Sequence, residues 1–223
     1  MLLAFVCSVT LFNLFRVHVD AQGTQVITTT QVNLVDSDGE LRGVLSGEDE
    51  YGMSSIAFYD DQGQVRATFG IENSGSPVLR LNNQDGVDRL SARVVSEDAR
   101  LIVGDDKRQG QFALVSGMPV LSFAEEGINR VGVQMGQEGE PSLVLFGSEG
   151  HRSVSLSVDS NDTPLVTLYE KGRQRLSFGV VREAAVFNAS DGDQTRLVMG
   201  VAQNGRPSIN FLNENGEVIQ ELP

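Results

Sequence analysis

Apolar and polar residues alternate in short runs along most of the chain after residue 31, and each run ends at a glycine. The segments VNLVDSDGELRGVL (32–45), IAFYDDQGQVRATF (56–69) and LRLNNQDGVDRLSA (79–92) each place apolar residues seven and five positions before a glycine. A period of two is typical of a β-strand with one apolar side, and Asp or Asn followed by Gly is typical of a tight turn. The pattern therefore predicts many short strands joined by turns.

These segments are copies of an internal repeat of about 22 residues. Glycines share one column, arginines follow three positions later, and five of the six prolines lie eight or nine positions before a column glycine. Because proline has no N–H, we expect these prolines at the first position or the edge of a strand. The candidate turn residues are Gly39, Arg42, Asp60, Gly63, Arg66, Gly86, Arg89, Gly127, Arg130, Gly172, Arg175 and Gly216.

Two kinds of all-β architecture fit a repeat with two strands and two turns. In a β-solenoid each repeat forms one coil, whereas in an antiparallel meander, barrel or propeller-like sheet each repeat forms a hairpin. A simple hairpin with Gly63 in a bulge would place Phe58 beside the charged Arg66 on one face. Because a solenoid corner has no such constraint, the sequence favours a β-solenoid of about nine repeats over residues 32–223, and the antiparallel architectures are the alternatives.

The N-terminal segment differs from the repeats because residues 2–15, LLAFVCSVTLFNLF, are almost wholly apolar. As a helix this run spans about 21 Å, less than the ~30 Å of a bilayer core, and a snorkelling Arg16 would extend it. We expect a membrane-anchor or assembly segment at 1–21 and a linker at 22–31, with a cleaved signal peptide or a buried helix as alternatives. The expected contact residues are Leu2, Leu3, Phe5, Val6, Val9, Leu11, Phe12, Leu14 and Phe15.

The net charge and the cysteine content restrict the classes of partner and ligand that the sequence allows. The net charge is −13, from 30 acidic and 17 basic residues, and nucleic acid is not an expected partner because phosphate binding needs a positive surface. The single cysteine, Cys7, lies in the apolar run, so no disulfide or cysteine metal site is expected. The expected partners are a membrane, other proteins or copies of this chain.

No residue pattern marks a catalytic, cofactor or metal site. The acidic segment 36–40, DSDGE, does not fit an EF-hand loop, because Leu34 and Leu45 would occupy its first and last ligand positions. Weak calcium binding along stacked aspartates is the alternative. His18 and His151 have no marked partners for a metal or a catalytic triad. The sequence therefore predicts no enzyme and no cofactor.

The acidic and basic residues of the turns have a simpler interpretation. Aspartates in turns accept hydrogen bonds from the local backbone. We expect Arg42, Arg66 and Arg89 to form ion pairs with Asp36, Asp60 and neighbouring repeats across the turn. A stripe of stacked arginines that docks an acidic partner is the alternative.

The phrase LVDSDGELRGVL, with the Gly-x-Pro-x-Leu strand starts, resembles uncharacterised bacterial envelope proteins that combine an N-terminal apolar segment with tandem L-x-D-x-x-G-x-x-R repeats. The resemblance covers roughly residues 30–220 and implies a repeat architecture without catalytic residues. We expect a non-enzymatic scaffold anchored in a membrane, with its repeats in the periplasm or extracellular space, that serves as an accessory subunit of a larger complex. The alternatives are a secreted protein, a self-assembling fibre or tube subunit, and a carbohydrate-binding or carbohydrate-cleaving β-helix.

Overall fold

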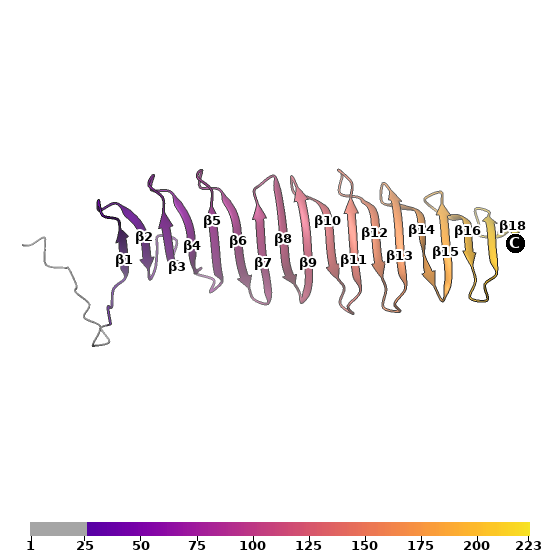
Figure 1. The fold of residues 1–223 in the computed structure, drawn as a ribbon, viewed down its shortest axis with the longest axis horizontal. Coiled ribbons are helices and arrows are strands. Elements are labelled where there is room, and N and C mark those ends of the chain that lie inside the picture. Colours follow the sequence, from indigo (N-terminus) through magenta and orange to yellow (C-terminus); the bar gives the residue numbers. More distant parts are fainter. Residues whose placement is uncertain (1–25) are drawn as a thin grey trace, which may run out of the picture. The chain divides into compact units, whose positions relative to one another are not determined.

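The computed structural model describes residues 26–223, and residues Gln31–Pro223 form one unit that consists of a single β-sheet (Figure 1). The expected anchor segment and the first residues of the expected linker lie outside the described residues. The strands are β1 Gln31–Val35, β2 Leu41–Ser46, β3 Ser54–Tyr59, β4 Val65–Ile71, β5 Pro77–Asn82, β6 Asp88–Val95, β7 Asp98–Gly104, β8 Arg108–Val115, β9 Met118–Glu125, β10 Ile128–Met135, β11 Pro141–Phe146, β12 Arg152–Val158, β13 Pro164–Glu170, β14 Arg173–Val181, β15 Ala184–Ser190, β16 Thr195–Val201, β17 Pro207–Leu212 and β18 Val218–Leu222.

Each strand pairs antiparallel with the next strand in the sequence, so the described sheet is a meander that begins at β1 and ends at β18. With two strands in each repeat, the eighteen strands make up nine repeats, which confirms the all-β repeat architecture. The β-solenoid expectation is wrong in the described residues, because a solenoid strand pairs in parallel with the equivalent strand of the next repeat. The pairing found is that of the antiparallel meander.

The reason for this error is a β-bulge at the position of the arginine column. In the β3–β4 hairpin, Tyr59 lies opposite Val65 and Phe58 lies opposite Ala67, which leaves Arg66 as an extra residue. A bulge shifts the face on which the following residues lie by one position. Phe58 is therefore paired with an alanine and not with the arginine side of the strand. The extra residues of the eight bulged hairpins are Arg42, Arg66, Arg89, Arg130, Ser153, Arg175, Arg196 and Ile219.

The β7–β8 hairpin has no such register shift: Gly104 lies opposite Gln109 and Val103 lies opposite Gly110. This hairpin is the copy in which the glycine column is interrupted, within LIVGDDKRQG (101–110). Its tighter turn makes a bulge unnecessary, and the apolar residues of its two strands still share one face.

The prolines mark the opposite edge of the sheet from the column glycines. Pro77, Pro141, Pro164 and Pro207 are the first residues of β5, β11, β13 and β17, and Pro119 is the second residue of β9. A proline at a strand start leaves no ladder hydrogen bond unmade. The expected placement of the prolines is confirmed.

With the bulges included, the two faces of the sheet have different compositions. Residues directly opposite each other in an antiparallel ladder point to the same face. One face, which we name the apolar face, contains a central row with one apolar residue from every strand. In strand order this row is Val32, Leu45, Ile56, Phe69, Leu79, Ala92, Leu101, Phe112, Leu121, Val133, Leu143, Leu156, Val166, Phe178, Phe187, Met199, Ile209 and Leu222.

The apolar face continues on both sides of this row. Toward the column-glycine edge a second row runs through residues such as Phe58, Leu90, Phe123 and Leu168, and Gln220 is its one polar side chain. Toward the proline edge lie apolar pairs, which are Ile71–Pro77, Val94–Ala99, Leu114–Pro119, Met135–Pro141, Val158–Pro164, Val180–Ala185 and Val201–Pro207.

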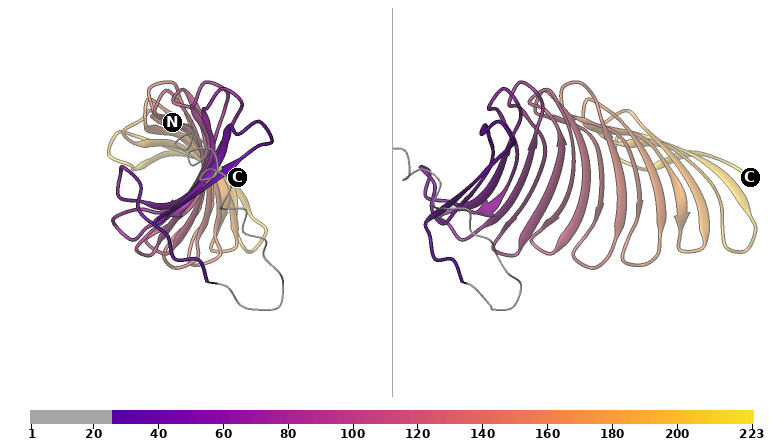
Figure 2. Two further views of the ribbon diagram at one scale, coloured as in Figure 1. Left: turned by 90° about the vertical axis from the view of Figure 1, so that its left-hand side faces the viewer. Right: turned by 60° about the vertical axis from the view of Figure 1, so that its left-hand side comes forward.

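The opposite face, which we name the small-residue face, consists mainly of Ser, Thr, Gly, Asn, Ala and Val. One row of it contains Ser155, Thr167, Ser177 and Asn188 on four successive strands. End-on and oblique views show that the strand direction rotates progressively from β1 to β18, so both faces are twisted (Figure 2).

Candidate functional site: the apolar face of the sheet

Many large side chains of the apolar face are exposed, although they are the ones that burial would stabilise most. Phe112 is 59% exposed, Phe69 56% and Phe178 48%. On the small-residue face, by contrast, Val78, Ala113 and Thr167 are each only 2% exposed. All strand residues that carry a side chain and are buried lie on the small-residue face: Ser46, Ser55, Val78, Ala113, Val144, Ser155, Thr167 and Ser177.

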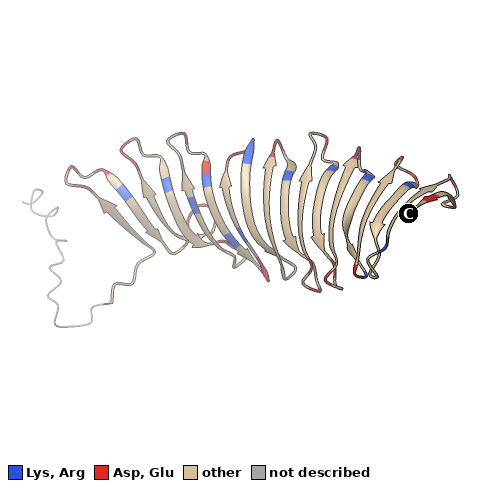
Figure 3. Cartoon of the chain, turned by 45° about the vertical axis from the view of Figure 1, so that its right-hand side comes forward, with Lys and Arg blue, Asp and Glu red and all other residues tan. Residues whose placement is uncertain are grey.

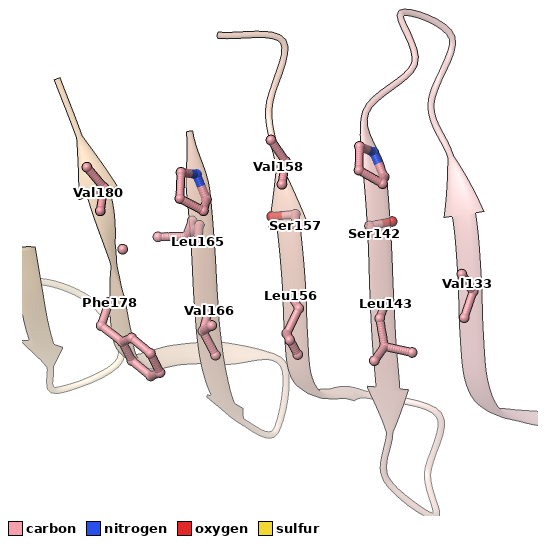
Figure 4. Close-up of a pocket in the computed structure, with 13 residues that line it drawn as sticks. Val133, Ser142, Leu143, Leu156, Ser157, Val158, Leu165, Val166, Phe178 and Val180 are labelled. Atoms are coloured by element: carbon pink, nitrogen blue, oxygen red, sulfur yellow. The ribbon is translucent and has the colours of Figure 1, made fainter. Parts of the chain in front are cut away.

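The apolar face is hollowed by open grooves. The groove over β10–β14 has a volume of about 510 Å³, and Figure 4 shows Leu143, Leu156, Val166 and Phe178 at one level across its strands. The remaining lining residues are Val133, Pro141, Ser142, Ser157, Val158, Pro164, Leu165, Gly179 and Val180. None of these described lining residues carries an acidic, basic or thiol side chain.

Two further grooves lie on the same face. One, over β14–β17, has a volume of about 600 Å³ and includes Phe187 and Met199, and the other, over β6–β9, has a volume of about 450 Å³ and includes Leu101 and Phe112. All three grooves are bordered by prolines of the proline edge. The phenylalanines Phe112, Phe178 and Phe187 therefore belong to the walls of these grooves.

Several polar groups of the small-residue face are paired within the sheet. The Asn188 Nδ2 donates to Ser177 Oγ at 3.3 Å, and Gln174 Nε2 donates to the same oxygen at 3.2 Å. Arg80 and Arg93 share the Glu72 carboxylate at 3.0 and 2.6 Å. Asn82 Oδ1 is the one buried side-chain polar atom in the described residues that has no hydrogen-bond partner. Because its side chains are small and several of its polar groups have internal partners, this face depends less on a further layer than the apolar face does.

The turn aspartates bond the backbone of their own turn. Asp60 Oδ1 accepts hydrogen bonds from the backbone N–H groups of Gln62 and Gln64 at 3.0 and 2.9 Å. The hydrogen bond from the Gln64 N–H is the main cause that lowers the pKa of Asp60. The same arrangement, led by the N–H of Arg108, lowers the pKa of Asp105 to about 2. These carboxylates bend the chain, and Gly63 completes the turn with a φ of 75°.

Three arginines of the column form the expected ion pairs. Arg42 and Arg66 pair with Asp36 and Asp60 at 2.7 and 3.3 Å, and Arg89 pairs with Asp105 of the next repeat. These contacts confirm the expected pairing. Their partners lie in the same chain, which reduces the positive charge that a stripe would offer to an acidic partner.

The remaining candidate chemistry is sparse in the described part of the chain. No group of three or more His, Cys, Asp and Glu residues there is arranged to hold a metal ion, and His151 Nε2 lies 3.9 Å from Glu149 Oε2 at a turn. The carboxylate of Asp36, in the calcium-like segment, is engaged by its own turn and by Arg42. Cys7 and His18 lie outside the described residues.

Sequence reasoning named the turns but missed the apolar face. Its signal was present, because apolar residues recur both before and after each column glycine. Without the bulge, however, the two sets fall on opposite faces. Residues such as Phe69, Phe112 and Phe178 were therefore not recognised as one surface.

Comparisons with known proteins do not assign this chain to a family. No protein-family model matches this chain, and no curated protein matches its sequence. Among residues 26–223 there is also no helix with the length and hydropathy needed to cross a membrane.

Proposed function

We propose that this protein is a non-enzymatic scaffold whose apolar face docks a partner along the whole sheet. The observation that carries the proposal is the uncovered apolar row to which all eighteen strands contribute. At ~4.8 Å per strand the row is about 80 Å long. If the apolar face is ~15–20 Å wide, its area is roughly 1,200–1,600 Å². Soluble monomers rarely expose an apolar patch larger than about 300–600 Å².

The chemistry of the grooves also supports a docking role. The lining of the β10–β14 groove has no described group that could act as an acid, a base or a charged nucleophile. Ser142 and Ser157 belong to the small-residue face by their register, so their hydroxyls are not presented to the groove. Such a surface binds apolar side chains, and it offers a sugar few hydrogen-bond partners.

The proposed scaffold is anchored in a membrane. The apolar run at 2–15 would hold the scaffold at a membrane, with the sheet in the periplasm or the extracellular space as accessory subunit of a larger complex. The resemblance of the repeats to bacterial envelope proteins supports this location.

A self-assembling fibre is a second candidate, favoured by the ends of the sheet. The strand number is even, so β18 runs antiparallel to β1, and β1 of another copy could extend the meander at β18. In such a fibre Leu222 and Val32 would continue the central apolar row.

Two neighbouring substitutions on β8 test the docking proposal. Phe112 lies on the apolar face and Gln111 on the small-residue face. We expect Phe112→Lys to release the full-length chain from its native assembly on a native gel, whereas Gln111→Lys leaves the assembly intact. If neither substitution changes the assembly, or both change it equally, the apolar face is not the docking surface.

A further inference from the structure

We infer that the apolar face is covered by the apolar face of a second copy of this chain, so that two sheets form a β-sandwich. This inference rests on the proposed docking function and names its partner. It depends on three properties of the face: its area, its composition and its twist.

The area agrees with a stable homodimer. Two faces of roughly 1,200–1,600 Å² each would bury about 2,400–3,200 Å² in total, within the range of about 2,000–5,000 Å² of obligate homodimers. Covering only one groove, such as the one over β10–β14, would bury far less and leave most of the exposed phenylalanines in water.

The composition is that of a homodimer core. The central row contains only apolar residues, and the second row adds only Gln220 as a polar side chain. Interfaces between identical subunits are more apolar than those of transient complexes, which keep charged residues for specificity. Charged residues lie instead at the turns, near the strand ends and on the small-residue face, where Arg80, Arg93 and Arg100 are found (Figure 3).

The twist favours a partner with the same twist. Two sheets with the same hand of twist pack aligned at about −30° and remain in contact along their length. A second copy supplies this match by symmetry, because the two-fold related surfaces are identical. Exposed rings such as Phe112 and Phe178 could then fill the hollows of the facing sheet.

A lipid surface is a poorer occupant for the same reasons. A bilayer is flat and would meet only part of a twisted face (Figure 2). The net charge is −13, and acidic turns border the apolar face, so contact would bring carboxylates toward anionic headgroups. Two sheets about 10 Å apart would instead leave these turns in water.

The test uses the full chain in a mild non-ionic detergent and measures its protein mass by sedimentation equilibrium. We expect a mass twice the 24.1 kDa of one chain. Leu156→Lys, on the apolar face, should raise the dissociation constant at least 100-fold, and Ser157→Lys, on the opposite face of β12, should change it less than threefold. Circular dichroism checks that both variants keep their β-structure.

A second readout does not depend on substitutions that could unfold the sheet. A photo-crosslinking phenylalanine analogue at Phe178 is introduced into a mixture of ¹⁴N and ¹⁵N chains. Crosslinks between ¹⁴N and ¹⁵N peptides of the apolar face are expected. A dimer crosslinked only through β1 or β18, or one unaffected by Leu156→Lys, would overturn the inference.

The failure of this inference differs from the failure of the docking proposal. A monomer whose Phe178 crosslinks to another protein or to lipid overturns the second copy as occupant and leaves the docking function intact. A monomer whose Phe178 reacts only with solvent overturns both.

Discussion

The two faces of the sheet are built from the same strands but satisfy different physical requirements. On the small-residue face, Thr167 and Ala113 are 2% exposed without a covering layer, since their neighbours and the backbone shield small side chains. On the apolar face, Phe112 in the same strand as Ala113 is 59% exposed. A single sheet can thus complete one face by itself, whereas large apolar side chains on the other face require a second layer.

The faces stay separate because each bulge contains one extra residue, so a change in that number should have the largest effect. Insertion of one alanine between Arg66 and Ala67 would place Ala67 and Phe69 on the small-residue face of β4. We expect a loss of about 3 kcal/mol or more in the free energy of unfolding, measured by urea denaturation. An unchanged midpoint would show that the bulge does not determine the faces.

Close backbone packing on the small-residue face gives the next largest effect. A Cβ at Gly179 would clash with the Pro164 carbonyl oxygen. We expect Gly179→Val to cost about 2–3 kcal/mol in urea denaturation. Ala92→Val, on the central row of the apolar face, is the matched control and should change the stability by less than about 0.5 kcal/mol. Equal costs at the two sites would contradict the difference between the faces.

A turn glycine separates backbone strain from packing. At Gly63 no atom lies within 4 Å of a built Cβ, but φ is 75°. Gly63→Ala should therefore cost about 1–2 kcal/mol through left-handed backbone strain alone, again by urea denaturation. A neutral result would mean that the turn readily adopts another conformation.

The turn carboxylates should make the stability of the sheet depend on pH, independently of the two faces. The pKa of Asp105 is lowered to about 2, from an ordinary value near 3.9. A lowered pKa contributes stability above the unfolded value, and this contribution is lost as pH falls through the folded value. The urea midpoint should be flat above about pH 5 and fall between about pH 4 and pH 2. Asp105→Asn should reduce this slope, and an unchanged slope would contradict the assignment.

The smallest effect is expected where the side chain but not the bulge is changed. Arg66→Ala keeps the extra residue and removes a partly buried ion pair with Asp60 and the hydrogen bond that Arg66 Nε donates to the Asn82 carbonyl oxygen. Its unfolding free energy should differ from that of the wild type no more than for an ordinary surface substitution. A loss as large as that of the alanine insertion would show that the guanidinium, and not the number of residues in the bulge, maintains the register.

The repeat, its two strands and its turns could be predicted because they depend on local chemistry. The turn glycines are needed because φ is positive there, and the prolines begin strands because they have no N–H to donate. Asp60 accepts hydrogen bonds from N–H groups within four residues of it. The pairing partner of each strand could not be predicted in this way. It depends on one extra residue at Arg66 and its equivalents, and a shift of one position reverses the face of every following side chain.

Oxidative footprinting of the phenylalanines tests most directly whether the apolar face is covered. In the native assembly of the full chain, Phe112 and Phe178 should be modified at least tenfold more slowly than after denaturation. Tyr51, which lies at a turn and is 79% exposed, serves as the reference and should react equally in both states. If Phe112 and Phe178 react as fast in the native assembly as in the denatured chain, the apolar face is open to water and has no docking role.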